Sequence, residues 1–325
     1  MRPASPQRRP RDVVVVDAPS NLGLRMPEPG VVPGCYKLAG ALRDQGLVPR
    51  LGARDGGVVV PPRYLSLGWR PGDGVFNATA MAGYTLRLAD RVDQLSSADT
   101  VLLVLGGDCS ILLGPALALR RRGRYGLVFI DGHTDFRHLG NSPHVGAAAG
   151  EDLALVTGRG QPDLADLDGL APYFRDEDVV LLGPHDEDDP TLAEARGLFP
   201  LVRTARELRA TGIENAAAEA LGRLDPAQLD GIWVHLDLDV LDPDCMPAVD
   251  SPDAGGLDFA ELAGLLGVLL SDPRTVGMDV TVFDPDLDGT GVLAAAISDT
   301  LVTGVQVGQV KSSPGRGIRD YGGDA

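Results

Sequence analysis

Short runs rich in Val and Leu alternate along the chain with longer segments in which apolar residues recur at helical spacing. The short runs are apolar on both faces, which is typical of parallel strands that helices cover on both sides. We therefore predict strands at Val13–Asp17, Thr100–Leu105, Tyr125–Asp131, Asp178–Gly183, near Leu198–Arg203, and at Gly231–Asp237 and Val276–Thr281.

Helices are predicted between these strands. Their expected ranges are Gly34–Gln45, Asn77–Leu95, Pro115–Arg122, Thr191–Leu198, Ala205–Leu224, Asp258–Leu270 and Leu293–Val305. Asp258 stands where its side chain would cap the free N–H groups of the sixth helix. This alternation predicts an α/β fold with a doubly wound parallel sheet, in which ligands bind beyond the carboxyl ends of the strands. The chain shows no internal repeat, so we expect one domain over residues 12–311, between a disordered N-terminal tail (1–11) and a flexible C-terminal tail (312–325).

Composition excludes several classes of protein. The 325 residues are 44% hydrophobic, enough for a substantial core. No apolar run approaches the ~18 residues of a membrane span, so we expect no membrane association. The 29 Lys and Arg against 46 Asp and Glu give a net charge of −17, which argues against a nucleic-acid partner. Three cysteines do not make a disulfide framework, and the valine run near the N-terminus is too short for a signal peptide, so we expect a cytoplasmic protein.

Unusual polar residues follow three of the predicted strands. The turn Gly106–Ser110 reads Gly-Gly-Asp-Cys-Ser, and taken alone it is an ordinary strand-to-helix turn in which Asp108 or Ser110 caps the next helix. Asp131, His133 and Asp135 follow another strand at spacings that would place all three on one side of an extended segment. Carboxylates and an imidazole that converge at a strand end call for a cation, and a divalent metal is the simplest one.

A second acidic cluster strengthens the metal hypothesis. Alternation would place His235, Asp237 and Asp239 on one face of their strand while the leucines and valine between them take the other. Buried carboxylates without a counter-charge are costly, so two such clusters at two strand ends predict a binuclear metal site.

These segments together resemble the ureohydrolase family of arginases, agmatinases and formiminoglutamases, of which this chain would be a divergent member. The family carries a Gly-Gly-Asp-His-Ser turn, an Asp-Ala-His-x-Asp strand end and an acidic Asp-x-Asp-x-x-Asp-Pro strand. The matching segments here are Gly106–Ser110, Asp131–Asp135 and Asp237–Pro243, and the match extends from Val13 to about Val305. The resemblance implies a three-layer αβα fold with a mostly parallel central sheet, as in arginases and deacetylases. It also implies two Mn²⁺ ions and a homo-oligomer, a trimer or hexamer.

The resemblance also implies roles for single residues. Asp131 and Asp237 would bridge the two ions, Asp135 would bind one of them, and His133 and Asp239 would bind the other. The ions would turn a bridging water into a hydroxide that attacks the electrophilic carbon of the substrate.

Three further residues match family positions that act on the substrate. His144 falls where arginases carry a loop histidine that shuttles protons to the leaving amine. Asn141 matches a contact to the substrate carboxylate, and Asp188 matches an aspartate that recognises a substrate amino group. The loop after Asp135 is shorter than in arginases.

The metal ligands depart from the family pattern at one position. Cys109 stands where the family has a sixth ligand, a histidine. A thiolate is soft while Mn²⁺ prefers oxygen and imidazole, so the outcome is one weaker site, another divalent metal such as Zn²⁺, or one empty site. His235 would either support or replace a ligand here, or be a core histidine bonded to a backbone carbonyl, the interpretation that we favour.

The substrate-binding pattern departs at Val282. The family reads Asp-x-x-Glu-x-Asn-Pro, and its glutamate pairs with the substrate guanidinium. Alignment on Asp279 and Pro285 places Val282 at that glutamate and Asp284 at the asparagine. Burial of a guanidinium without a carboxylate is costly, so a neutral group such as an N-hydroxyguanidine or an amide is favoured, unless a register shift lets Asp279 or Asp284 pair with it.

The sequence therefore predicts a hydrolase with two metal ions that cleaves a non-peptide linear C–N bond of a small guanidino, hydroxyguanidino or related compound. The alternative from another class is a non-catalytic subunit or regulator of the same fold with a degraded metal site. Cys109 and Val282 support that alternative, whereas the retained acidic residues and His144 argue against it.

Overall fold

The computed structural model describes residues 11–65, 68–143, 145–185, 188–225 and 228–311. Both predicted tails, apart from residue 11, lie outside the described residues. In the part described, no helix is both long and apolar enough to span a membrane.

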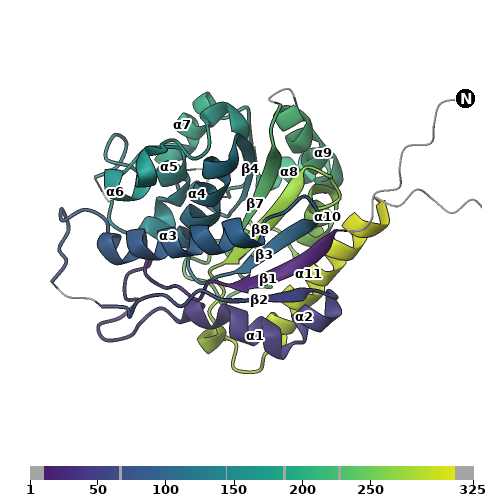
Figure 1. Ribbon diagram of the computed structural model, residues 1–325, viewed down its shortest axis with the longest axis horizontal. Helices are drawn as coiled ribbons and strands as arrows, with labels where there is room; N and C mark the ends of the chain where they lie inside the picture. Colours follow the sequence, from purple (N-terminus) through teal and green to yellow (C-terminus); the bar gives the residue numbers. More distant parts are fainter. Residues whose placement is uncertain (1–10, 66–67, 144, 186–187, 226–227, 312–325) are drawn as a thin grey trace, which may run out of the picture.

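Eight parallel strands form one sheet in the order β2-β1-β3-β8-β7-β4-β5-β6 (Figure 1). The strands are β1 (Asp12–Asp17), β2 (Arg54–Val58), β3 (Thr100–Leu105), β4 (Tyr125–Ile130), β5 (Val179–Gly183), β6 (Leu201–Thr204), β7 (Gly231–Asp237) and β8 (Thr275–Thr281). The central strands are buried on both faces, as their continuous apolar runs predict.

Helices cover both faces of the sheet and make a three-layer αβα fold, which confirms the expected fold class (Figure 1). The helices on one face are α3 (Ala78–Leu95), α4 (Leu113–Arg122), α5 (Asp152–Val156), α6 (Pro162–Ala165) and α7 (Pro190–Leu198). The other face carries α1 (Leu38–Asp44), α2 (Leu47–Arg50), α8 (Ala205–Thr211), α9 (Ile213–Leu224), α10 (Phe259–Leu269) and α11 (Val292–Lys311). Each layer has its own apolar core against the sheet.

Local sequence signals account for most of these elements. Asp258 caps α10 by accepting a hydrogen bond from the Glu261 amide, as predicted. The helix expected over 205–224 is instead two helices, because Gly212 between them has a φ of 85°. β2 was not predicted, because its sequence Arg-Asp-Gly-Gly-Val has no apolar run; only one of its residues is buried at this sheet edge.

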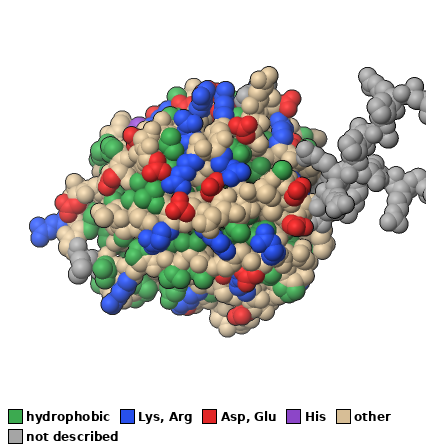
Figure 2. All heavy atoms as spheres, viewed as in Figure 1, with side chains coloured by type: hydrophobic (Ala, Val, Ile, Leu, Met, Phe, Trp, Pro, Cys, Tyr) green, Lys and Arg blue, Asp and Glu red, His purple; other side chains and the backbone are tan. Residues whose placement is uncertain are grey.

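The visible face of the molecule mixes both signs of charge. Figure 2 shows Lys and Arg side chains interspersed with Asp and Glu. Arg121, for example, pairs with both Asp90 and Asp168, and Arg122 pairs with Asp93. The acidic excess therefore does not form one continuous patch on this face.

Candidate metal centre

The candidate site lies where four neighbouring strands end. β3, β8, β7 and β4 are adjacent in the sheet and parallel, so their carboxyl ends meet at one edge. The turn after β3 provides Cys109, the turn after β4 provides Asp131–Asp135, and the end of β7 provides Asp237 and Asp239. Sequence positions more than 100 residues apart thereby come within hydrogen-bond reach.

The first group of possible ligands consists of Asp131, His133 and Asp239. One donor atom from each lies within 4.8 Å of the other two. His133 Nδ1 is 2.9 Å from Asp239 Oδ2, and its Nε2 is 3.1 Å from Asp253 Oδ2. The Gly132 amide donates to Asp239 Oδ1 at 3.0 Å and so holds the two turns together.

The second group consists of Cys109, His235 and Asp237, whose donor atoms also lie within 4.8 Å of one another. The Cys109 thiol donates to Asp237 Oδ2 at 2.5 Å and lies 3.4 Å from Thr281 Oγ1. All three candidate ligands are fully or almost fully buried. The two groups are joined through the chain, because the Asp239 amide donates to Asp237 Oδ1.

β7 presents His235 and Asp237 on extended backbone, as predicted, but the backbone that presents Asp135 and Asp239 is not extended. β4 ends at Ile130, and Asp135 has a φ of 43°, in the left-handed region. Asp239 lies in the 3₁₀ turn Leu238–Val240 rather than on the strand. The side chains still converge, because tight turns at adjacent strand ends aim them into one space.

Burial of carboxylates dominates the electrostatics of the site. It raises the pKa of Asp131 and of Asp237 well above the ordinary value, and neighbouring carboxylates raise both further. For Asp135 burial raises the pKa to about 6, against the lowering effect of His133.

His133 partly compensates for this crowding. Burial lowers the pKa of His133, but its hydrogen bond to Asp239 and the charge of that carboxylate outweigh burial and raise the pKa to about 11. For Asp239 burial raises the pKa, and the His133 hydrogen bond and charge together lower it below the ordinary value. One imidazolium thus offsets only one of several buried carboxylates.

The donor set fits divalent cations. Asp131 Oδ2 and His235 Nε2 are buried and have no hydrogen-bond partner, which is costly unless a cation completes them. Carboxylate, imidazole and thiolate are the side chains that bind divalent transition metals. The geometry of the described residues is therefore suited to two ions, one in each group.

The partner of His235 is not the backbone carbonyl that we expected for a core histidine. His235 Nδ1 pairs instead with Asp279 Oδ2 at 2.5 Å, and Trp233 Nε1 donates to Asp279 Oδ1 at 2.5 Å. Asp152, which the sequence analysis did not identify, lies 3.8 Å from His235 Nε2. A carboxylate at the start of the apolar helix α5 was a signal that could have identified it.

Asn141 and Asp188 belong to neither of these two groups. The Asn141 carbonyl accepts a bond from the His138 amide, and its side-chain N–H groups donate to Phe136 and Glu194, so the side chain stabilises its own loop. Asp188 is exposed on a turn. His144 lies outside the described residues. The substrate contacts of these residues stay predictions.

Val282 occupies the edge of the site in a strained conformation. It is 3% exposed and has a φ of 73°, which β-branched residues rarely adopt, and its amide donates to the Gly107 carbonyl at 2.7 Å. The two carboxylates that a shifted register would use already have partners: Asp279 contacts Trp233 and His235, and Asp284 accepts from the Gly34 and Asp286 amides.

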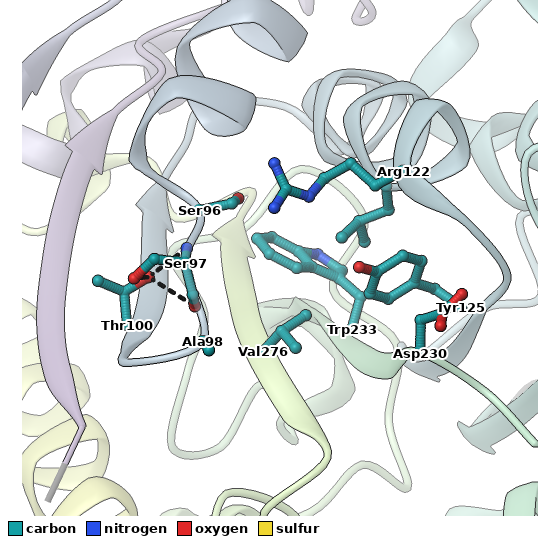
Figure 3. A pocket seen from close by; sticks show the side chains of 10 residues that line it. Ser96, Ser97, Ala98, Thr100, Arg122, Tyr125, Asp230, Trp233 and Val276 are labelled. Atoms are coloured by element: carbon teal, nitrogen blue, oxygen red, sulfur yellow. Dashed lines mark hydrogen bonds between the residues drawn. The ribbon is translucent and has the colours of Figure 1, made fainter.

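A cavity of about 540 Å³ opens at the opposite edge of the sheet, at the amino ends of β3, β4 and β8 (Figure 3). Trp233 lines it together with Arg122 and Tyr125. The same indole contacts Asp279 on its inner side. This cavity is separate from the two ligand groups, which lie beyond the carboxyl ends of the strands.

Comparison with known proteins agrees with this geometry. The sequence model described as "Arginase family" matches residues 28–304. The arginase of Bacillus caldovelox is 31% identical over 231 residues, which cover 69% of this chain and 76% of that protein. The crystal structure of the Bacillus caldovelox arginase superposes with a TM-score of 0.79 at 26% identity, covering 91% of this chain and 98% of that one. Formimidoylglutamase from Bacillus subtilis shares the fold, with a TM-score of 0.72 at 18% identity over 93% of this chain and 88% of that one.

The buried carboxylates predict how the metal-free protein responds to pH. The pKa of Asp135 is about 6 in the folded protein against 3.8 in the unfolded chain. The stabilisation that protonation of Asp135 gives to the folded protein is therefore fully present below about pH 3.8 and is lost as the pH rises through 6. The free energy of unfolding, measured by urea denaturation with a chelator present, should therefore fall from pH 4 to 7, by about 3 kcal/mol at most for this group.

Two controls separate the effect of the site carboxylates on stability from the effect of the net charge of the whole chain. Asp135→Asn should flatten this slope, and saturating Mn²⁺ should restore stability at pH 7. Metal-free stability that rises between pH 4 and 7 would contradict the explanation.

Proposed function

The chain belongs to the arginase family, and we propose that it is a binuclear-metal hydrolase that cleaves a non-peptide linear C–N bond of a small guanidino, hydroxyguanidino or related compound. The observation that carries this proposal is the pair of buried ligand groups at one sheet edge, joined by the bond from the Asp239 amide to Asp237. Buried acidic groups at this density are costly to a fold that does not use them.

The two ligand groups support a different set of ligands for each ion. We expect two Mn²⁺ ions, or another divalent metal in the group that contains Cys109. Asp131 and Asp237 would be shared between the ions, with Asp135 on one ion and His133 and Asp239 on the other. When bound, a pair of divalent ions supplies a hydroxide nucleophile at neutral pH.

Backbone amides fix the ligands in place before any ion binds. The Gly132 amide orients Asp239, the His133 amide orients Asp131 at 2.6 Å, and the Asp239 amide orients Asp237. Preorganised ligands lose little conformational entropy on binding, which favours a defined geometry over a loose acidic patch. His144 remains the candidate for proton transfer to the leaving amine.

Val282 supports a neutral reacting group over a guanidinium. Neither Asp279 nor Asp284 is free to replace the missing carboxylate, because both are held by other donors. A permanently charged guanidinium would then lose its hydration without a partner. We propose an N-hydroxyguanidine or an amide as the reacting group.

The alternative is a non-catalytic subunit or regulator with a degraded metal site. Loss of the family histidine at position 109 favours it. The burial of Asp131, Asp237 and Asp239 argues against it, since a site without a cation gains nothing from buried carboxylates that repel one another. The enzyme is therefore the better supported function.

Replacement of Asp237 tests catalysis by this site. Asp237→Asn removes the shared ligand and should lower the rate of urea or ammonia release by about 10³-fold or more, because bound metal supplies several kcal/mol of transition-state stabilisation. The assay uses a panel of guanidino, hydroxyguanidino and amide compounds with metal-loaded protein. Wild-type protein that is fully loaded yet hydrolyses none of them would favour the non-catalytic alternative.

Replacement of Val282 tests the choice of substrate. Val282→Glu should raise kcat/KM for a guanidinium compound such as agmatine or arginine by at least about 10-fold, because each 1.4 kcal/mol of new pairing contributes a factor of 10. Val282→Gln is the matched control, since it has a similar size and no charge. Efficient cleavage of arginine or agmatine by the wild-type protein would contradict the proposed role of Val282.

A further inference from the structure

A buried chain of three side chains on β7 and β8 ends at the candidate metal centre. His235 and Asp279 are paired residues of the two neighbouring strands, so their side chains lie next to each other on one face of the sheet. Asp279 accepts from Trp233 through one oxygen and contacts His235 Nδ1 through the other, at 2.5 Å in each case. The imidazole ring is also stacked on Phe129, with ring centroids 4.5 Å apart. The orientation of His235 is therefore fixed on both its edge and its face.

The Nε2 atom of His235 is unusual because it is buried without a partner. His235 is 0% exposed, and its Nε2 has neither a hydrogen-bond partner nor access to solvent. With Nδ1 occupied by Asp279, the donor that His235 can offer to Cys109 and Asp237 within 4.8 Å is Nε2. A histidine that served only to fill the core would bond both nitrogens, because an unsatisfied buried one costs about 1–3 kcal/mol.

Asp152 adds a carboxylate to the same place. Its Oδ2 is 3.8 Å from His235 Nε2, too far for a hydrogen bond, and neither of its oxygens accepts a well-formed one. Asp152 and His235 come from different elements, yet both present unpartnered polar atoms to one buried space.

This arrangement has a known physical counterpart. Histidines that bind metal usually give their other ring nitrogen to a carboxylate, which fixes the tautomer and makes the ligand atom more basic. Asp279 stands in that relation to His235, and Trp233 holds Asp279. The contact of Nδ1 with Asp279 leaves Nε2 as the ring nitrogen available to a cation.

We propose that His235 Nε2 takes over the ligand role of the histidine that Cys109 replaces, and that Cys109, His235 and Asp237, whose ligand atoms lie together, form with the neighbouring Asp152 a site that prefers Zn²⁺ to Mn²⁺. Asp279 is a positioning residue for His235. Thiolate and imidazole are typical zinc ligands, and Cys109 and His235 supply one of each to this group. The group of Asp131, His133 and Asp239 has no sulfur and suits Mn²⁺, so the centre would hold two different metals. This inference deepens the proposed function, because it specifies one of the two proposed ions.

Metal binding can be measured without any substrate. Metal-free full-length protein is titrated with Zn²⁺, Mn²⁺ and Co²⁺ separately, and stoichiometry is measured by elemental analysis after removal of unbound ion. Co²⁺ serves as the probe for zinc ligands, because a thiolate bound to cobalt gives a charge-transfer absorption in the near ultraviolet. Cys109→Ser should abolish that absorption. Cys35→Ser is the matched control, since Cys35 is equally buried but contacts the Ser20 carbonyl.

His235→Asn and Asp279→Asn separate a ligand from a positioning residue. His235→Asn should weaken Zn²⁺ binding by more than 100-fold and change the visible absorption of bound Co²⁺. Asp279→Asn should keep the stoichiometry and weaken binding by about 10–100-fold. Mn²⁺ bound by the other group should be retained in both variants. Wild-type zinc affinity and an unchanged cobalt spectrum in His235→Asn would overturn the proposal.

Asp152→Asn keeps the test decisive if His235→Asn does not fold. Asparagine has the same shape as the aspartic acid side chain, so the metal-free variant should melt close to the wild-type temperature while it binds Zn²⁺ at least 10-fold more weakly. Lower metal-free stability together with unchanged zinc affinity would show that Asp152 is structural and would overturn its ligand role.

Failure of this proposal is distinguishable from failure of the proposed function. Zinc and cobalt results as expected, with no hydrolysis of any compound, would reject the activity and leave the metal site standing. Hydrolysis by a protein in which His235→Asn binds zinc normally would reject the metal site and leave the activity standing.

Discussion

The structure depends on how several aspartates are accommodated beyond the carboxyl ends of four buried parallel strands. Asp131, Asp135, Asp237 and Asp239 are each at most 7% exposed. Carboxylates this close cannot all be ionised in a dry interior unless positive charge lies among them. His133 supplies a share of that charge through its contact with Asp239. The negative charge that His133 does not neutralise is the reason that the fold is suited to divalent cations. The turns after the strands hold the carboxylates close together for such ions.

Cys109 is one member of a larger set of buried polar side chains. Its thiol contacts Asp237 directly, and His235 on β7 presents an unpartnered nitrogen to the same space. His235 is in turn held by Asp279 and Trp233, so a single departure from the family pattern is accompanied by a connected set of buried polar residues across β7 and β8. Such a set is stable only when every member is satisfied, which is the physical argument for an ion at its end.

Val282 is the distinctive residue on the side of the centre where we expect the substrate. Val282 brings an apolar side chain and a left-handed backbone to the position where the family carries a glutamate. Strain of this kind persists only where surrounding contacts impose it, here the bond from the Val282 amide to Gly107. The acidic residues nearest in sequence are used elsewhere, Asp284 as a helix cap and Asp279 as the partner of His235. Metal ligands that resemble the family are therefore combined with a substrate edge that does not.

The sequence by itself determined the layered α/β fold, seven of the eight strands and the two acidic clusters, because continuous apolar runs and buried carboxylates are local signals. β2 was missed because an edge strand with one buried residue carries no such signal. Tertiary structure alone decided that Asp152 approaches His235, that Asp279 contacts both His235 and Trp233, and that Asn141 donates to Glu194. Those outcomes depend on which side chains from distant segments meet, and that is settled by packing across the sheet, which spacing along the chain does not encode.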